Sequence, residues 1–339
     1  MNSFIELPLL EHTQAIQIVW AALAVEKFIR ISSSIDPLSF FRFICQRMAS
    51  KVLKQPNSSK QLLISGSLAL LMLVLPFLIV VYLVHQFASY QWLIDIMLLW
   101  VLIQFTNDIN IVNKGINALQ TGKKQLAKDL LQQKLLRNTQ TLSALGLAKA
   151  SLESIFVRYH HQQFTVILSY LLLGPIGALC YRLCYEANQV WNIKLKEFYY
   201  FGRLTNIVTQ IFQLVPSLIM SISFVFISSP KSLISHLKHK FFLVGIKQTL
   251  GLQNNQSLLL QTLSSALNIN TGGPVMYKTT KIQRTRFTST KNEKSRINEV
   301  ELSNEPTIDS VKTLISLVNR HLIVCALIIT WIMFWYSPN

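Results

Sequence analysis

Residues 62–87 read "LLISGSLALLMLVLPFLIVVYLVHQF", and in this stretch only His85 can carry a charge. The hydrocarbon core of a bilayer is about 30 Å thick, so a helix needs roughly 20 mostly apolar residues to cross it. The stretch is therefore expected to be a membrane-spanning helix, and the rest of the chain is expected to lie in or against a lipid bilayer.

Four other apolar segments are candidate spans: 92–105, 164–181, 207–227 and 321–336. A sixth segment, 15–28, is short and contains Glu26, so it is expected either to lie in the membrane interface or to pack as half a span. The sequence thus predicts an all-α, polytopic integral membrane protein with five or six membrane segments. The lipid bilayer is an expected partner of the protein.

Charge supports this topology. The chain has 14% charged residues, well below the roughly 25% of an ordinary soluble domain. Its net charge is +17, but 28 of its 32 lysines and arginines lie in segments 27–60, 107–163 and 228–320. Cytoplasmic loops carry excess basic residues, so these three segments are expected to be cytoplasmic, with the turn near Ala88 outside. This placement of the charge argues against nucleic acid as a partner.

The two long cytoplasmic segments differ in pattern. Residues 107–163 read as amphipathic helices, with Leu126, Leu130 and Leu131 at helical spacing. They are expected to form a helical hairpin packed on the cytoplasmic face, with a helix on the membrane surface or a platform for a substrate phosphate as the alternatives. Residues 228–320 are expected to be a cytoplasmic loop with a flexible, polar part at 278–310. With no internal repeat apparent, residues 1–339 are expected to form a single membrane domain.

An unusual break interrupts segment 164–181, where residues 171–183 read "LLLGPIGALCYRL". Pro175 removes an amide donor and bends a helix, while Gly174 and Gly177 let another backbone or a ligand come close. Such a break is tolerated at membrane depth only where protein or water satisfies the freed groups. The segment either spans the membrane or re-enters it from one side.

Few residues of the spans carry obvious chemistry. Asp95 is either a functional group at depth or an interfacial residue near Trp92. His160 and His161 follow Glu153, and a histidine pair near a glutamate could bind a metal. Because adjacent residues on a helix point in different directions, a structural or interfacial role is expected instead. Arg182 and Arg203 could hold a phosphate or anchor the span among headgroups.

Common cofactor motifs are missing from the sequence. The chain contains no Gly-x-x-x-x-Gly-Lys loop, no dinucleotide fingerprint and no His-Glu-x-x-His motif. The scattered cysteines do not complete a zinc site and are expected to be free thiols: Cys45, Cys180, Cys184 and Cys325. No metal ligand set is predicted.

The order of several blocks resembles a known family. In sequence these are "IDPLSFFRFICQRM", "LLRNTQTLSALGLAKASLES", "LLLGPIGALCYRL", "EFYYFGRLTNIVTQIFQLVPSLI", "ALNINTGGPVMYK" and "EPTIDSVKTLISLVNRH". Together they resemble the integral-membrane cobalamin-biosynthesis family CobD/CbiB, with AmpE as a related second choice. The resemblance covers nearly the whole chain.

The resemblance implies an enzyme, adenosylcobinamide-phosphate synthase, that joins adenosylcobyric acid to an aminopropanol, usually its phosphate, by an ATP-dependent amide bond. It implies ATP and Mg²⁺ as cofactors, a corrinoid as substrate, contact with other cobalamin-assembly enzymes, and location in the bacterial cytoplasmic (inner) membrane. Glu153 and Arg182 would be catalytic. Substrate-binding residues would be Gly174, Pro175, Gly177, Tyr181, Arg203, Gly272, Gly273 and Tyr277.

The departures from the family pattern leave a second reading open. Where the family has acidic residues, this chain reads "VRYHHQQ", "YEAN" and "RLTNIVTQ", and the arginine after the proline is missing at "VPSLI". The alternative is therefore an AmpE-like, non-catalytic signalling modulator or scaffold. A transporter is disfavoured because the spans carry few ionisable groups and show no repeat.

Overall fold

The computed structural model describes residues 3–29, 36–53, 58–135, 137–238, 240–250, 255–277, 280–287 and 305–336. The chain divides into two compact units, each built from separate stretches of sequence. The first comprises Met1–Gln104, His161–Gln213 and Ala326–Asn339, and the second comprises Phe105–His160 and Leu214–Cys325. The expected single domain therefore stays a prediction.

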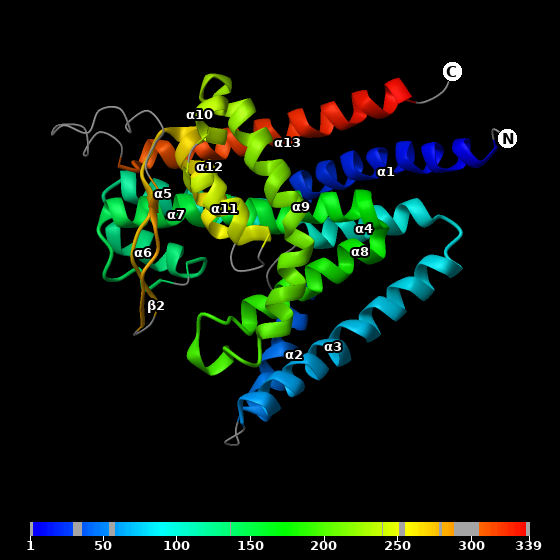
Figure 1. Cartoon of the computed structure of the whole chain (residues 1–339), viewed down its shortest axis with the longest axis horizontal. Helices are drawn as coiled ribbons and strands as arrows, with labels where there is room; N and C mark the ends of the chain where they lie inside the picture. Colours follow the sequence, from blue (N-terminus) through cyan, green and yellow to red (C-terminus); the bar gives the residue numbers. More distant parts are fainter. Residues whose placement is uncertain are drawn as a thin grey trace. The chain divides into compact units, whose positions relative to one another are not determined.

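Helices make up the first unit almost entirely. They are α1 (Ser3–Phe28), α2 (Pro37–Val52), α3 (Ser59–Phe87), α4 (Gln91–Leu102), α8 (Thr165–Val190), the short 3-10 helix Lys196–Phe198, the start of α9 (Arg203–Ser228) and the end of α13 (Ile308–Tyr336). Helix α8 packs against α2, α3 and α4, and α1 packs against α4. Figure 1 shows α3 and α4 as a hairpin joined by a short turn.

The starts of these helices follow from local sequence. Asp36 caps α2 by accepting a hydrogen bond from the Leu38 N–H at 2.9 Å, and Pro37 occupies the first helical position, where no N–H is needed. Ser58 and Gln61 form a reciprocal capping box at the start of α3. These caps fix where the chain enters each helix.

Five helical segments are long and apolar enough to cross a membrane: Ser59–Phe87, Gln91–Gln120, Ala144–Val190, Arg203–Ser228 and Ile308–Ile332. Each contains or overlaps one of the five main segments expected from sequence, so the polytopic, all-α prediction is confirmed. On α3, large apolar side chains such as Leu68, Met72 and Ile79 are exposed, as lipid-facing residues would be. The chain is thus a multi-pass membrane protein.

Segment 15–28 lies within α1, which is not among the five candidate spans of the described residues. Ile16, Val19 and Ala22 are buried, and Trp20 donates its indole N–H to the Thr330 hydroxyl at 3.1 Å. This part of α1 therefore packs on protein rather than standing apart from it.

The Gly-Pro break is a real break in α8. Gly174 has φ 69° and ψ −170°, a conformation that is essentially restricted to glycine. Pro175 follows and begins the second half of the helix, where its missing N–H costs nothing. At Gly177 a Cβ would lie 2.2 Å from the Leu173 Cβ, and no described atom lies within 4 Å of a Cβ built at Gly174. The close approach expected at Gly177 is thus made by Leu173 of the same helix.

The second unit contains α5 (Thr106–Gln120), α6 (Lys124–Gln132), α7 (Ala144–Arg158) and the π-helical turn Tyr159–Phe164, which crosses the boundary between units. Helices α5, α6 and α7 pack on one another, as expected of a helical bundle. The expected apolar stripe is partly wrong, because Ala127 and Leu131 are buried while Leu126 is exposed.

Segment 228–320 is not simply a loop. It contains the 3-10 turn Pro230–Ser232, α10 (Leu233–Lys238), α11 (Lys240–Leu250), α12 (Gln256–Leu267) and the start of α13. Strand β1 (Thr271–Gly272) pairs antiparallel with β4 (Arg286–Phe287), and β2 (Val275–Tyr277) pairs with β3 (Thr280–Ile282). The expected flexible part thus includes two strands. Its residues 278–279 and 288–304 lie outside the described residues.

Replacing Gly174 with alanine tests the break. The alanine must either hold a strained conformation, at a cost of about 1–3 kcal/mol, or straighten α8. We expect Gly174→Ala to lower the thermal unfolding midpoint of the detergent-purified protein by several degrees. Gly146→Ala, in the helical conformation of α7 with its nearest contact at 3.3 Å, is the control. Equal midpoints for Gly174→Ala and the wild type would contradict the assignment.

Candidate functional site

A buried carboxylate on α7 organises one candidate site in the second unit. Glu153 is only 4% exposed. Arg137 Nη2 lies 2.6 Å from Glu153 Oε2, and Arg284 Nη2 lies 3.0 Å from the same oxygen. The other oxygen, Oε1, accepts the backbone N–H of Gly272 at 2.8 Å. Because both oxygens are used, Glu153 acts as an anchor for two guanidinium groups and a loop.

Gly272 and Gly273, which follow α12, adopt a backbone conformation that brings the Gly272 N–H to Glu153. Gly272 and Gly273 have φ angles of 72° and 92°, which favour glycine. A Cβ on Gly272 would lie 2.3 Å from the Thr285 carbonyl oxygen. The Gly273 N–H donates to that oxygen at 3.1 Å, and Arg284 Nε donates to the Gly273 carbonyl at 3.2 Å. The structure therefore brings Glu153, Gly272 and Gly273 together, and Tyr277 follows in β2.

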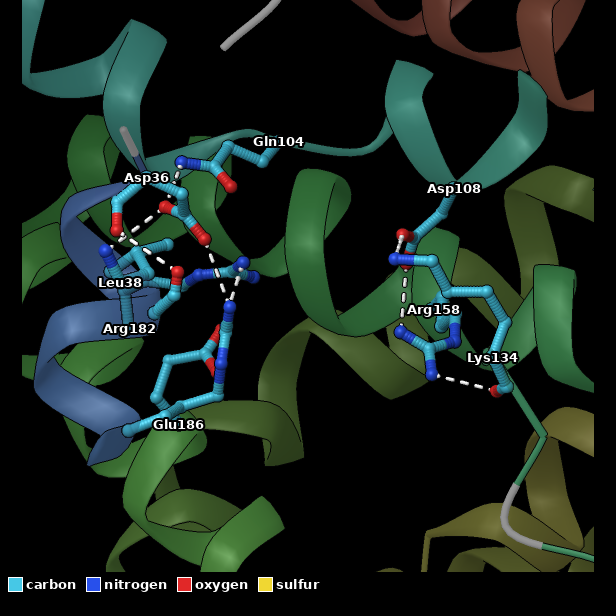
Figure 2. A network of polar contacts seen from close by, with 10 residues as sticks. Asp36, Leu38, Gln104, Asp108, Lys134, Arg158, Arg182 and Glu186 are labelled. Carbon is cyan, nitrogen blue, oxygen red and sulfur yellow. Dashed lines mark hydrogen bonds and ion pairs between the residues drawn. The ribbon is translucent and has the colours of Figure 1, made fainter. Parts of the chain in front are cut away.

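A second charged network lies in the first unit (Figure 2). Arg42 donates to Glu186 Oε2 at 2.8 Å and to Asp36 Oδ2 at 2.9 Å. Arg182 Nη2 lies 3.0 Å from Glu186 Oε1, one helical turn away on α8. Gln104 Nε2 donates to Asp36 Oδ1 at 2.7 Å. Two arginines thus balance two carboxylates, so the network is neutral.

Arg182 has donors to spare. Its side chain is only 2% exposed, and its Nε and Nη1 atoms find no hydrogen-bond acceptor among the described residues. A buried donor left unpaired costs about 1–3 kcal/mol, and more when it is charged. These two atoms are therefore suited to an oxygen acceptor. Because the network is already neutral, an uncharged oxygen suits it better than an additional anion.

The remaining residues expected at the site are placed differently. Tyr181 is fully buried, where its hydroxyl donates to the His161 carbonyl at 2.8 Å and accepts from Gln213 at 3.0 Å. Gly174, Pro175 and Gly177 form the break described above. Arg203 is exposed at the start of α9 and is not part of the Arg182 network.

A third network, centred on Asp108, lies in the second unit (Figure 2). Asp108 is bound by Lys134 at 2.6 Å and by Arg158 at 2.7 Å. Arg158 also donates to the Lys134 carbonyl at 2.8 Å and to Ser154 at 3.3 Å. Every nitrogen of the Arg158 guanidinium thus has a partner, so this network is a structural tie between α5, α7 and the segment after α6.

Asp95 and the histidines singled out from the sequence are buried. Tyr170 donates to Asp95 Oδ2 at 2.9 Å, and His85 Nε2 lies 3.2 Å from Asp95 Oδ1. His160 Nε2 lies 3.1 Å from the Ser217 hydroxyl. Asp95 therefore ties α4 to α3 and α8, and His160 packs within its own unit.

The described residues do not fit a protein-held magnesium ion. Among them, no three His, Cys, Asp or Glu side chains are grouped so that they could hold a metal. The carboxylates of the three networks are bound instead by arginine and lysine side chains. The four cysteines are free thiols, as expected.

Several residues of these networks carried no sequence signal. Arg284 lies 131 residues from Glu153, and Arg42 lies 144 residues from Glu186. Pairing over such distances cannot be read from spacing. Arg137 lies in the "LLRNTQ" block of the family resemblance, but the resemblance assigned no role to this residue.

Removing the charge of Glu186 tests the neutral network. In Glu186→Gln, Arg182 loses the carboxylate that it contacts, and two arginines share the single carboxylate of Asp36. Breaking a buried ion pair in this way costs about 3–5 kcal/mol. We expect a clearly lower thermal midpoint in detergent. Glu305→Gln, which breaks the exposed pair with Arg286, should cost only about 0–1 kcal/mol.

The reactivity of the Cys45 thiol reports the loss of the negative charge at Glu186. Burial, with Glu186 adding to it, raises the pKa of the Cys45 thiol to about 12, so maleimide should label it slowly near pH 8. With the other cysteines replaced, Glu186→Gln should speed this labelling and Glu305→Gln should not. Unchanged labelling and unchanged stability in Glu186→Gln would contradict the network's role.

Comparison with known proteins agrees with the sequence blocks. The family model described as CobD/Cbib protein matches residues 19–304. The cobalamin biosynthesis protein CobD of Chromobacterium violaceum is 26% identical over 140 residues, which cover 40% of this chain and 44% of that relative. The match thus spans less than half of the relative's length, and no solved structure matches the chain. Since the family model covers most of the chain and confirms the resemblance of its blocks, the chain belongs to the CobD/CbiB family.

Proposed function

We propose that this membrane protein joins a corrinoid acid, adenosylcobyric acid, to an aminopropanol or its phosphate through an amide bond. Family membership supports a place in cobalamin biosynthesis. The observation that carries the proposal is Arg182, a buried arginine with two unused donors in the segment that carries the "GPIGALCYR" block. A corrinoid acid bears carboxamide groups, whose uncharged oxygens are the acceptors that a neutral network favours.

The chain's own groups have defined tasks in such a reaction. The Arg182 donors would hold an oxygen of the corrinoid and orient its reacting arm. The Asp36–Arg42–Glu186 contacts would keep the Arg182 guanidinium in place. The basic residues around Glu153 suit phosphate oxygens, because arginine and lysine neutralise their charge. ATP, when bound, would supply the phosphoryl group that makes the acid's oxygen a leaving group.

A second candidate function is a non-catalytic membrane scaffold or signalling modulator. The observation that favours it is that Asp36, Asp108, Glu153 and Glu186 are all ion-paired. Because the oxygens of these carboxylates already accept hydrogen bonds from basic side chains, they are not available to contact a substrate or metal–ATP. Other cobalamin-assembly enzymes in the bacterial cytoplasmic membrane would then be its partners.

Complementation separates the two functions. A strain that lacks the amide-forming step is supplied with cobyric acid and expresses this chain. We expect growth that depends on the corrinoid, and amide formation by the purified protein with ATP and aminopropanol phosphate. Growth should be lost in Arg182→Gln and kept in Arg203→Gln if Arg203 anchors the span among headgroups.

The expression level in the membrane is the control for each variant. No growth with the wild-type chain, despite membrane expression equal to that of a complementing relative, would overturn the enzymatic proposal and favour the scaffold. Amide formation by the purified protein would remove the scaffold as a sufficient account.

A further inference from the structure

Positive charge exceeds negative charge around Glu153. Three basic side chains, Arg137, Lys149 and Arg284, surround this single carboxylate, leaving two positive charges unbalanced. Lys149 lies four residues before Glu153 on α7, hence on the same face, and it interacts electrostatically with the carboxylates Glu153 and Glu305 and with the guanidiniums of Arg286 and Arg137. The nearby Arg286 is balanced by Glu305 at 2.9 Å. The excess is therefore local to the Glu153 cluster.

The two arginines of the cluster keep free donors. Arg137 gives only Nη2 to Glu153, and Arg284 gives Nη2 to Glu153 and Nε to the Gly273 carbonyl. A guanidinium has five N–H donors, so several remain on each side chain without an acceptor among the described residues. Both side chains are 17% exposed, so these donors are accessible at the edge of the unit. Arg158 of the Asp108 network, by contrast, has every nitrogen engaged.

The backbone N–H groups of Gly272 and Gly273 are not available to bind an anion. The N–H of Gly272 is bound by Glu153, and that of Gly273 is bound by the Thr285 carbonyl. An incoming anion would therefore meet side chains, held in place by Glu153. A phosphate group carries a charge of about −1.5 to −2 near neutral pH, which matches the unbalanced charge, and its oxygens suit arginine forks.

We propose that Arg137, Lys149 and Arg284 form a binding site for a phosphate group and that Glu153 is a positioning residue that holds the two guanidiniums side by side on its Oε2 atom. The inference rests on the proposed function only for which phosphate compound is used. The anion site itself follows from the charges and contacts of the second unit.

Binding of inorganic pyrophosphate to the full chain tests the site without any corrinoid. The protein is placed in phosphatidylcholine nanodiscs and titrated by calorimetry. We expect saturable binding that weakens about tenfold or more in Lys149→Gln and in Arg284→Gln, since a lost charge-assisted contact exceeds about 1.4 kcal/mol. Lys124→Gln, at an exposed position at the start of α6, is the control and should bind as the wild type does.

The Glu153→Gln variant distinguishes a positioning role of Glu153 from the electrostatic effect of its negative charge. Removing the negative charge would strengthen anion binding if electrostatics alone mattered. If Glu153 positions the guanidiniums, the same change weakens pyrophosphate binding although the cluster becomes more positive. Stronger binding in Glu153→Gln would overturn the positioning role.

A last arm distinguishes soluble phosphate from a lipid headgroup. Nanodiscs containing phosphatidic acid should compete with pyrophosphate only if a lipid phosphate also reaches the site. Binding of phosphatidic acid alone, lost in Lys149→Gln, would support the site and assign it to lipid. No binding of either probe by the wild type, or equal binding by all variants, would overturn the inference while leaving the complementation test of the proposed function standing.

Discussion

The pairing of buried charges is the constraint on which this structure depends. A carboxylate or guanidinium buried inside a protein loses its hydration, so it must find its partner within the protein. Glu186 meets this need with Arg42 and Arg182, and Glu153 meets it with Arg137 and Arg284. Each network also joins segments distant in sequence, so the contacts that pair the charges also hold parts of the unit together.

The two networks differ in their net charge and in the hydrogen-bond donors that they leave unpaired. The Glu186 network is neutral and buries an arginine with unused donors, whereas the Glu153 network has excess positive charge and accessible donors. The first is suited to an uncharged oxygen and the second to a phosphate. An amide-forming enzyme that handles a corrinoid acid and a phosphate compound needs both kinds of recognition.

Sequence reasoning predicted the membrane helices because their signal is local. The apolar run 62–87 became α3, and the Gly-Pro pair became a break at Gly174, since each follows from neighbouring residues. The helices within segment 228–320, which was expected to be a cytoplasmic loop, were not predicted, because α10, α11 and α12 are short and their apolar residues form few periodic turns. Leu259 and Leu263 are nevertheless fully buried on α12. Arg284 as a partner of Glu153 and Arg42 as a partner of Glu186 were not predictable, since ion pairs between distant segments have no characteristic spacing in the sequence.

The most direct measurement is the spectroscopic titration of cobyric acid into the protein in nanodiscs, comparing the wild type with Arg182→Lys. Lysine keeps a positive charge beside Glu186 but lacks the Nε and Nη1 donors that we expect to hold the corrinoid oxygen. The account predicts saturable binding by the wild type and binding at least about tenfold weaker in the variant. Equal affinity in both proteins, or no binding by the wild type, would contradict it.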